Sequence, residues 1–344
     1  LLSAFSSVDC INSSVALQEA GKHVIWSYAG ATPPSSLLAS IRQGKVAGVI
    51  FFKDNIDSNL ATHIASLKEA NSQSPTKLPL LLMTDQEGGQ VRRLAGEPTL
   101  SAKQIGSSSD PATEAYEAGQ GAAKNLVSNG MNLNLAPVVD VYRVAGDFDD
   151  RYGRSFSNDT KVVSVCGQRF VKGQKANGVA STVKHFPGLG AAGANENTDV
   201  GPVKIGKGIQ ELREVDEYPY IAAIAGGVEL VMPSWAVYTQ VDDRPAGMSP
   251  FWITTELRGR LGFQGVTISD AIEAGGLSSY GSDDGKRSLS AISAGMDLIL
   301  ASGRNVSQGE EIVQTIAKAI NQGTIDADDF AASTSRISKL RSSL

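Results

Sequence analysis

Several charged side chains stand directly after apolar runs in this sequence, where they could act on a bound substrate. The run 179–183 (VASTV) leads straight to Lys184 and His185, and then to a loop rich in Gly and Asn that holds Glu196 and Asp199. A buried strand that ends in a cation and an imidazole, and opens into a polar loop, is typical of a parallel α/β enzyme. A solvated lysine beside a buried histidine of the core explains the same residues equally well.

Two carboxylates end other apolar runs. Asp270 closes GVTISD (265–270), where a rigid and partly desolvated carboxylate could act as a nucleophile or a base. It could also cap the N-terminus of a following helix. Asp85 closes LPLLLMTD and opens a turn with acids, glycines and arginines up to Arg93, which favours hydrogen bonding to a polyol over a merely solvated loop.

Two arginines lie in the run DDRYGRSF (149–156). Arg151 and Arg154 could clamp a polar ligand through bidentate hydrogen bonds. They could equally pin their own loop through a neighbouring acid, namely Asp147, Asp149 or Asp150.

The elements that must position these residues follow an alternating rhythm. Eight apolar runs predict strands, at 23–26, 48–52, 79–84, 131–141, 179–183, 229–232, 266–269 and 297–300. Segments of helical period lie between and after them, at 59–70, 111–128, 159–177, 207–225, 288–295 and from 308 onward. Such alternation implies parallel strands joined by right-handed crossovers. We therefore predict one (β/α)8 barrel domain over 1–344, with its strands at roughly 23–300 and C-terminal helices at 308–344. A doubly wound sheet is the alternative, weakened because no G-x-G-x-x-G follows the first strand.

The barrel prediction can be tested within the sequence, because the active sites of such barrels lie where the strands end. Polar residues do mark five strand ends: Asp85, Asp140, Lys184–His185, Ser234–Trp235 and Asp270. This pattern supports an enzyme with a carboxylate-rich pocket for a sugar or polyol.

Composition excludes other classes. The chain of 344 residues is mildly acidic, with a net charge of -5, which argues against nucleic acid or an anionic membrane as partner. No apolar run approaches the ~20 residues of a membrane span. The sequence begins at Leu1 without Met or a basic, apolar leader, so we expect a chain that is processed or truncated, with any signal peptide already removed.

Cysteine, histidine and sequon usage add little chemistry. Cys10 and Cys166 could pair or remain free, and the three histidines, at 23, 63 and 185, form no ligand motif, so we expect no metal site. Three N-x-[ST] triplets, at Asn12, Asn158 and Asn305, favour a secreted glycoprotein weakly.

Taken together, four motifs carry a family resemblance. KHFPG (184–188), DQEGG (85–89), RSF (154–156) and SD (269–270) resemble glycoside hydrolase family 3, and more closely its single-domain β-N-acetylglucosaminidase branch. The resemblance covers roughly 26–300. It implies a β-N-acetylhexosaminidase that removes terminal β-linked N-acetylglucosamine with retention, as a monomer acting on an oligosaccharide or glycoconjugate, without metal or organic cofactor.

The resemblance also implies residue roles. Asp270 matches the nucleophile that forms a covalent glycosyl-enzyme intermediate, and Asp85 matches the acid that binds hydroxyls of the terminal sugar. Arg154, Lys184 and His185 match residues that line the same subsite, and we expect Arg93 to bind substrate with them.

One departure from the family concerns the general acid/base. That branch usually carries Asp-Ser-His in the loop after KHFPG, whereas this loop reads Asn197-Thr198-Asp199 and contains no histidine. Alignment puts Asp199 at the histidine position and Asn197 at that of its supporting acid. A retaining glycosidase needs an acid that also serves as base, so Asp199 is our first candidate, with Glu196 and Glu273 after it.

Four alternatives remain open from the sequence. The barrel could have lost its acid and become a sugar-binding protein, or it could be a β-glycosidase of different sugar specificity. A phosphate-binding barrel using Lys184 and the turn at 188–190 would need a glycine-rich loop after a late strand, of which 301–304 is a faint version. The two-domain β-glucosidase branch fits less well, because the chain ends about where the barrel closes.

Overall fold

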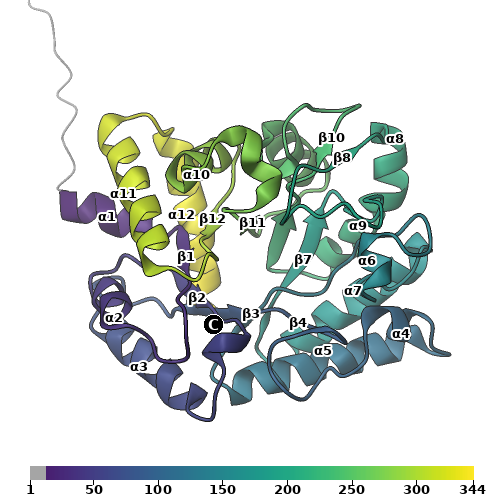
Figure 1. The fold of residues 1–344 in the computed structure, drawn as a ribbon, viewed down its shortest axis with the longest axis horizontal. Coiled ribbons are helices and arrows are strands. Elements are labelled where there is room, and N and C mark those ends of the chain that lie inside the picture. Colours follow the sequence, from purple (N-terminus) through teal and green to yellow (C-terminus); the bar gives the residue numbers. More distant parts are fainter. Residues whose placement is uncertain (1–12) are drawn as a thin grey trace, which may run out of the picture.

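Eight parallel strands close into a barrel in the computed structural model, which describes residues 13–344 (Figure 1). Around the barrel the strand order is β1-β12-β11-β9-β7-β6-β3-β2. The strands are β1 (Val24–Trp26), β2 (Gly48–Ile50), β3 (Leu81–Thr84), β6 (Leu133–Asn134), β7 (Ala180–Phe186), β9 (Leu230–Pro233), β11 (Val266–Ala271) and β12 (Leu298–Leu300). Each one falls on a predicted apolar run, so the (β/α)8 prediction is confirmed and the doubly wound alternative is wrong.

Helices surround the barrel and connect its strands (Figure 1). The longer ones are α1 (Ser13–Gly21), α2 (Ser35–Arg42), α3 (Leu60–Ser72), α5 (Pro111–Ser128), α7 (Thr160–Lys175), α9 (Tyr218–Ala225), α10 (Asp284–Ser293), α11 (Val306–Gln322) and α12 (Ala327–Ser342). A π-helix, η4 (Phe251–Arg260), takes the corresponding place before β11. None of the helices in the described part of the chain is long and apolar enough to cross a bilayer.

Short elements lie mostly in the connections. The helical ones are η1 (Lys53–Asn55), α4 (Ala102–Gly106), α6 (Phe148–Arg151), α8 (Ile209–Glu211), η2 (Leu212–Asp216), η3 (Ala246–Met248) and η5 (Gly275–Tyr280). Two small sheets pair β4 (Gln86–Gly88) with β5 (Val91–Arg92), and β8 (Lys204–Ile205) with β10 (Val237–Tyr238). The sequence predicted one helix at 207–225, whereas the structure divides this segment into α8, η2 and α9. Pro219 has no backbone N–H to donate to the preceding turn, so the helix restarts there as α9.

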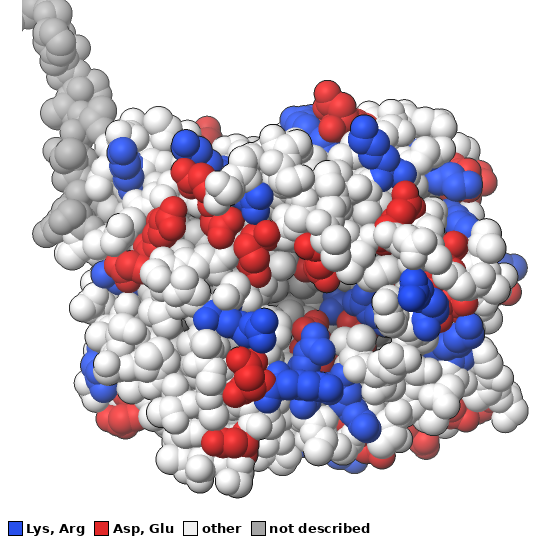
Figure 2. All heavy atoms as spheres, in the orientation of Figure 1, with Lys and Arg blue, Asp and Glu red and all other residues white. Residues whose placement is uncertain are grey.

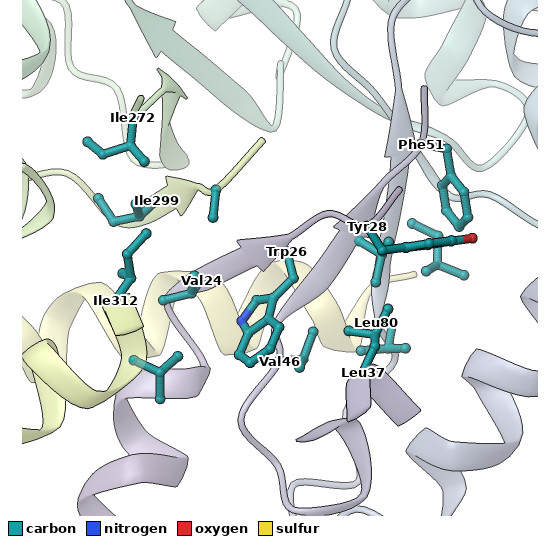
Figure 3. Packing of buried hydrophobic residues seen from close by; sticks show 14 of the residues in the cluster. Val24, Trp26, Tyr28, Leu37, Val46, Phe51, Leu80, Ile272, Ile299 and Ile312 are labelled. Atoms are coloured by element: carbon teal, nitrogen blue, oxygen red, sulfur yellow. The ribbon is translucent and has the colours of Figure 1, made fainter. Parts of the chain in front are cut away.

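The first strand shows how alternation builds two cores. Ile25 points into the barrel, while Val24 and Trp26 face the surrounding helices (Figure 3). α11 packs directly on the indole of Trp26 at Gly309. A Cβ at this position would lie only 2.4 Å from the ring, so the close contact requires glycine. Burial of this large aromatic side chain stabilises the packing of α11 on β1.

The N-terminal mouth of the barrel is closed by α12. Ile337 and Leu340 belong to the same buried cluster as the inward-facing strand residues. Arg341 is 1% exposed and donates hydrogen bonds to the carbonyls of Pro79 and Leu78, just before β3. Within residues 13–344, the opposite mouth, at the carboxyl ends of the strands, stays open for a substrate.

Cys10 and Asn12 lie outside the described residues, so predictions on them stay open. Cys166 is buried in α7 and forms no disulfide with a described residue. Asn158 and Asn305, the other two sequon positions, are exposed.

Candidate active site

A cavity of about 760 Å³ opens at the carboxyl ends of the strands. Figure 2 shows it as the hollow near the centre of the molecule, with acidic and basic side chains gathered around it. The seven residues that the sequence favours for catalysis and sugar binding line this cavity: Asp85, Arg93, Arg154, Lys184, His185, Asp199 and Asp270.

The first part of the cavity is a floor of paired charges, built from the hairpin β4–β5 and the end of β7. Lys184 Nζ lies 2.9 Å from Asp85 Oδ1 and 2.8 Å from Glu87 Oε1. Arg93 lies 3.3 Å from Asp85 Oδ2. Arg154 holds Glu87 with two hydrogen bonds, of 3.0 and 2.9 Å. We call these five residues the pocket floor.

Pairing fixes the charge state of the pocket floor. Burial disfavours ionisation of Asp85, yet Lys184 and Arg93 hold its pKa below the usual value. The pKa of Glu87 is likewise lowered, because Arg154 and Lys184 outweigh its burial. Asp85 and Glu87 in turn raise the pKa of Lys184, despite its burial. These carboxylates stay ionised acceptors and the cations stay donors at neutral pH.

His185 lines the cavity together with the pocket floor, and Asp140 orients its ring. Asp140 Oδ2 lies 2.7 Å from His185 Nδ1, and its Oδ1 accepts hydrogen bonds from the backbone N–H groups of His185 and Leu189. Burial lowers the pKa of His185, but the Asp140 carboxylate outweighs it and the net pKa is raised. With Nδ1 engaged, Nε2 is the ring nitrogen left for a ligand.

Of the two alternatives for Arg154, the structure shows the pinning of its own loop, and binding of a ligand stays a prediction. Its guanidinium lines the cavity, and it also pins its own loop by donating to Asp149 Oδ1 at 3.1 Å. Arg151 lies outside the cavity lining and donates to the carbonyl of Ala194.

Asp270 stands at the end of β11, half-buried, on the cavity wall. Its Oδ1 accepts a hydrogen bond of 2.8 Å from the N–H of Ala271. The next helical element, η5, begins at Gly275 and is capped by Ala274. Asp270 is therefore not a helix cap, and that alternative is wrong.

The loop 188–203 folds back to the cavity and is anchored beside Asp270. The N–H groups of Gly275 and Gly276 donate to the carbonyls of Asp199 and Thr198, at 2.9 and 2.7 Å. A Cβ at Gly275 would lie 2.1 Å from the carbonyl oxygen of Val200, so glycine is required for this docking. Asp199 itself donates its N–H to Asn197 Oδ1 at 2.9 Å.

Asp199 differs from the other two candidate acids in its surroundings. It is exposed at the cavity mouth, and partial desolvation by the cavity walls, followed by repulsion from Asp270, raises its pKa. Glu196 does not line the cavity and accepts a hydrogen bond from the N–H of Gly193. Glu273 does line it, but its carboxylate is held by Ser302 and Gln308.

Sequence reasoning did not assign three residues that the structure brings to the site. Glu87 lies two residues after Asp85, and that spacing could have indicated it. Asp140 was marked only as a strand end. Asp149 is one of three neighbouring acids in the loop after β6, and no sequence signal separates it from Asp147 or Asp150.

One group among the described residues has the spacing of metal ligands: Asp140, Asp149 and His185, with ligand atoms within 4.8 Å of one another. Two contacts argue against a metal ion there, however: Asp140 and His185 share a 2.7 Å hydrogen bond, and the Arg154 guanidinium donates to Asp149 Oδ1. The faint phosphate loop at 301–304 is engaged as well. The N–H groups of Ser302, Gly303 and Arg304 donate to Glu273, Gln308 and Ser27.

Comparison with known families and sequences gives consistent matches. The model of the glycosyl hydrolase family 3 N terminal domain matches residues 24–340. An uncharacterized secreted glycosyl hydrolase of Arthroderma benhamiae is 50% identical, over 95% of this chain and 93% of its own length. A beta-hexosaminidase of Stenotrophomonas maltophilia is 37% identical, over 76% of this chain and 77% of its own length.

Solved structures agree in fold. A family 3 beta-N-acetylglucosaminidase from Paenibacillus sp. str. FPU-7 superposes with a TM-score of 0.87 at 30% identity, over 94% of this chain. This chain spans only 62% of that longer protein. The beta-N-acetylhexosaminidase of Beutenbergia cavernae gives a TM-score of 0.81 at 29% identity, over 95% of this chain and 98% of its own.

Proposed function

Because this chain belongs to glycosyl hydrolase family 3, we propose that it is a retaining β-N-acetylhexosaminidase. In this proposal it removes terminal β-linked N-acetylglucosamine from oligosaccharides or glycoconjugates. The observation that carries the proposal is the placing of Asp270 and Asp199 on one cavity, over a floor of paired charges suited to sugar hydroxyls. The names of the relatives from Stenotrophomonas, Paenibacillus and Beutenbergia support the sugar specificity.

In the first step, an Asp270 oxygen attacks the anomeric carbon and the bond to the leaving oxygen breaks. Asp199 transfers its proton to that oxygen, so the aglycone leaves as a neutral alcohol. The raised pKa of Asp199 supports this role, because the acid must hold a proton before the step.

In the second step, Asp199 is the base. It takes a proton from water, the water oxygen attacks the anomeric carbon from the face that the aglycone left, and the bond to Asp270 breaks. Formation of the covalent intermediate removes the negative charge of Asp270, so repulsion of the Asp199 carboxylate falls and its ionised form becomes favoured. The change in the pKa of Asp199 thus matches its change of role.

The pocket floor holds the terminal sugar. Asp85 and Glu87 offer ionised acceptors, while Arg154 and Lys184 offer charged donors, all fixed before substrate arrives. His185 adds the Nε2 atom that Asp140 leaves free. We further propose that the protein is secreted, on the strength of the relative of that description from Arthroderma benhamiae.

The test is hydrolysis of aryl β-N-acetylglucosaminide beside aryl β-glucoside, with the configuration of the first-formed sugar followed by proton NMR. The proposal expects turnover of the acetamido sugar with β product formed first. An α product first, or preference for the glucoside, would refute it. If neither is hydrolysed while calorimetry detects binding of N-acetylglucosamine, the chain is instead a sugar-binding barrel, the interpretation that the missing loop histidine favours.

A further inference from the structure

Beside Arg154 and His185, two carboxylates lie close together, and no described group donates a hydrogen bond between them. Asp149 comes from α6 and is 1% exposed, and Asp140 follows β6 and is fully buried. Their oxygen atoms lie within 4.8 Å of each other and of a His185 nitrogen. Asp149 Oδ2 is buried and has no hydrogen-bond partner among the described residues.

The charges around this pair do not balance. Four carboxylates, those of Asp85, Glu87, Asp140 and Asp149, face three permanent cations, those of Arg93, Arg154 and Lys184. A buried array with an uncompensated charge is strongly unfavourable. One proton, held among Asp140, Asp149 and His185, neutralises the array. On His185 this proton would balance the charge, but it would leave Asp149 Oδ2 beside Asp140 without a donor, because His185 Nδ1 is already engaged with Asp140.

The hydrogen bonds indicate where that proton lies. Asp140 accepts from three N–H groups, two of the backbone and His185 Nδ1, which favours its ionised form. Among the described residues, Asp149 accepts hydrogen bonds only from Arg154, its Oδ2 has no donor, and its side chain lies within hydrogen-bonding reach of Asp140. A proton on that oxygen supplies the missing donor and removes the repulsion between the two carboxylates.

A metal ion fits less well than a proton at this place. The contact between Asp140 Oδ2 and His185 Nδ1 is 2.7 Å, the length of a hydrogen bond. The guanidinium of Arg154 also lies against Asp149, and a fixed cation there opposes a divalent one.

We propose that Asp149 is a positioning residue that carries a proton, donates it to Asp140, and so holds the His185 ring in place for the sugar. The value of this positioning for catalysis rests on the function proposed above, whereas the proton on Asp149 does not. The geometry is reinforced by electrostatics, since burial and then the Asp140 carboxylate raise the pKa of Asp149 to about 7.

The other charged groups near Asp140 and Asp149 either oppose protonation of Asp149 or are paired with a residue of opposite charge. Arg154 and His185 face Asp149 directly and oppose its protonation. Asp216 lies behind Asp140 and is paired with Arg143. Asp150, next in the chain, pairs with Lys103 at 2.7 Å.

The first test compares thermal unfolding of the wild type, Asp149→Asn and Asp150→Asn between pH 5 and pH 8, without substrate. The folded state binds the Asp149 proton more tightly than the unfolded chain does, so wild-type stability falls as the pH rises through about 7. The amide that replaces the carboxyl in Asp149→Asn is a neutral donor at every pH. The unfolding temperature of Asp149→Asn should therefore gain on the wild type as the pH rises, and that of Asp150→Asn should not.

A different pH dependence is expected if Asp149 carries no proton. If Asp149 is simply the ionised partner of Arg154, Asp149→Asn is less stable than the wild type by an amount that stays constant over this range. That outcome overturns the proposal. So does a wild-type unfolding temperature that falls on addition of EDTA, because a bound metal ion would then replace the proton.

The second test reads positioning through kinetics on the aryl N-acetylglucosaminide. At pH 6, Asp149→Asn should keep kcat and KM within about twofold, while Asp149→Ala should raise KM about tenfold through loss of one oriented hydrogen bond. Above pH 7 the wild-type KM should rise and that of Asp149→Asn should not. Equal damage by the two substitutions at pH 6 would refute positioning by a protonated Asp149. Because unfolding is measured without turnover, failure of the proposed function would leave the first test intact.

Discussion

The pocket floor and the loop that carries Asp199 present carboxylates in two opposite states. Asp85 and Glu87 lie within 3.3 Å of cations, and their pKa values are lowered in spite of their burial. Asp199 forms no ion pair with any residue that the structure describes, and its neighbour Asp270 helps to raise its pKa. Pairing therefore makes permanent acceptors of the floor acids, while isolation lets Asp199 exchange a proton.

The largest effect should come from Asp270, which belongs to neither group because it must stay ionised and unpaired to attack carbon. Asp270→Asn should lower kcat by about 10⁴–10⁶-fold, the range found when members of a catalytic triad are removed. Its unfolding temperature should stay close to that of the wild type, since the side chain is half-buried and forms only one local hydrogen bond. Turnover near the wild-type level would rule out Asp270 as the nucleophile.

A complementary measurement on the same position uses Asp270→Ala with sodium azide. Azide can occupy the space of the lost carboxylate and attack from its side of the sugar ring. The expected product is the α-glycosyl azide, identified by NMR. A β-glycosyl azide would mean that the nucleophile lies elsewhere.

The second largest effect should fall on the loop. Asp199→Ala should cut hydrolysis of substrates with poor leaving groups by about 10²–10⁴-fold, the usual contribution of general acid catalysis. Activated aryl glycosides need little protonation and should lose less. The wild-type kcat should fall as pH rises through the raised pKa of Asp199, because the acid loses its proton, and this limb should vanish in the variant.

Matched variants at the rejected acids test the choice of Asp199. Glu196→Ala removes a carboxylate of the same loop that does not line the cavity, and Glu273→Gln neutralises one that lines it but is hydrogen-bonded. Neither should change the dependence on the leaving group. If Glu273→Gln alone reproduces the expected loss, the acid is Glu273.

The fold and four of the five pocket-floor residues, all except Glu87, could be predicted because their signals are local. Eight apolar runs marked all the barrel strands, and the helical segment predicted at 111–128 is α5. The strand predicted at 131–141 is only Leu133–Asn134 in the structure. The apolar run continues beyond it as a connection, in which Pro137 has no N–H for a ladder hydrogen bond.

The pairing of Asp149 with Asp140, and the approach of Asp199 to Asp270, could not be predicted from local signals. Both depend on how a long connection folds in space. The loop with Asp199 is fixed by backbone hydrogen bonds to Gly275 and Gly276, about 75 residues further along the chain, and these leave no side-chain pattern to recognise.

The third prediction separates the two regions by stability. Arg154→Met leaves Glu87 and Asp149 without their cation in a buried site, which should cost about 3–5 kcal/mol of unfolding free energy. Urea unfolding can measure this. Asp199→Ala should change stability by less than about 0.5 kcal/mol, because the side chain is exposed and unpaired.

The control for that contrast is Arg151→Met, a change of the same kind in the same loop. Arg151 is exposed and donates one hydrogen bond to a carbonyl, so its loss should cost less than about 1 kcal/mol. Equal costs for the two arginine variants would show that the pocket floor is not held by its charges.

The smallest effect should come from Asn197, which orients Asp199 without touching substrate in our proposal. Asn197→Ala removes the acceptor of the Asp199 N–H, a bond of 2.9 Å worth about 1 kcal/mol, so kcat should fall by less than about tenfold.

Asn197→Asp keeps an acceptor there and adds a negative charge near Asp199. That charge disfavours ionisation of Asp199, so its pKa should rise and the fall of kcat should move to higher pH. An Asn197→Asp profile that coincides with the wild type would mean that Asp199 is not the group whose proton limits the reaction. The Asp199 carboxylate would then be a permanent acceptor like Asp85 and Glu87, and another group would supply the proton.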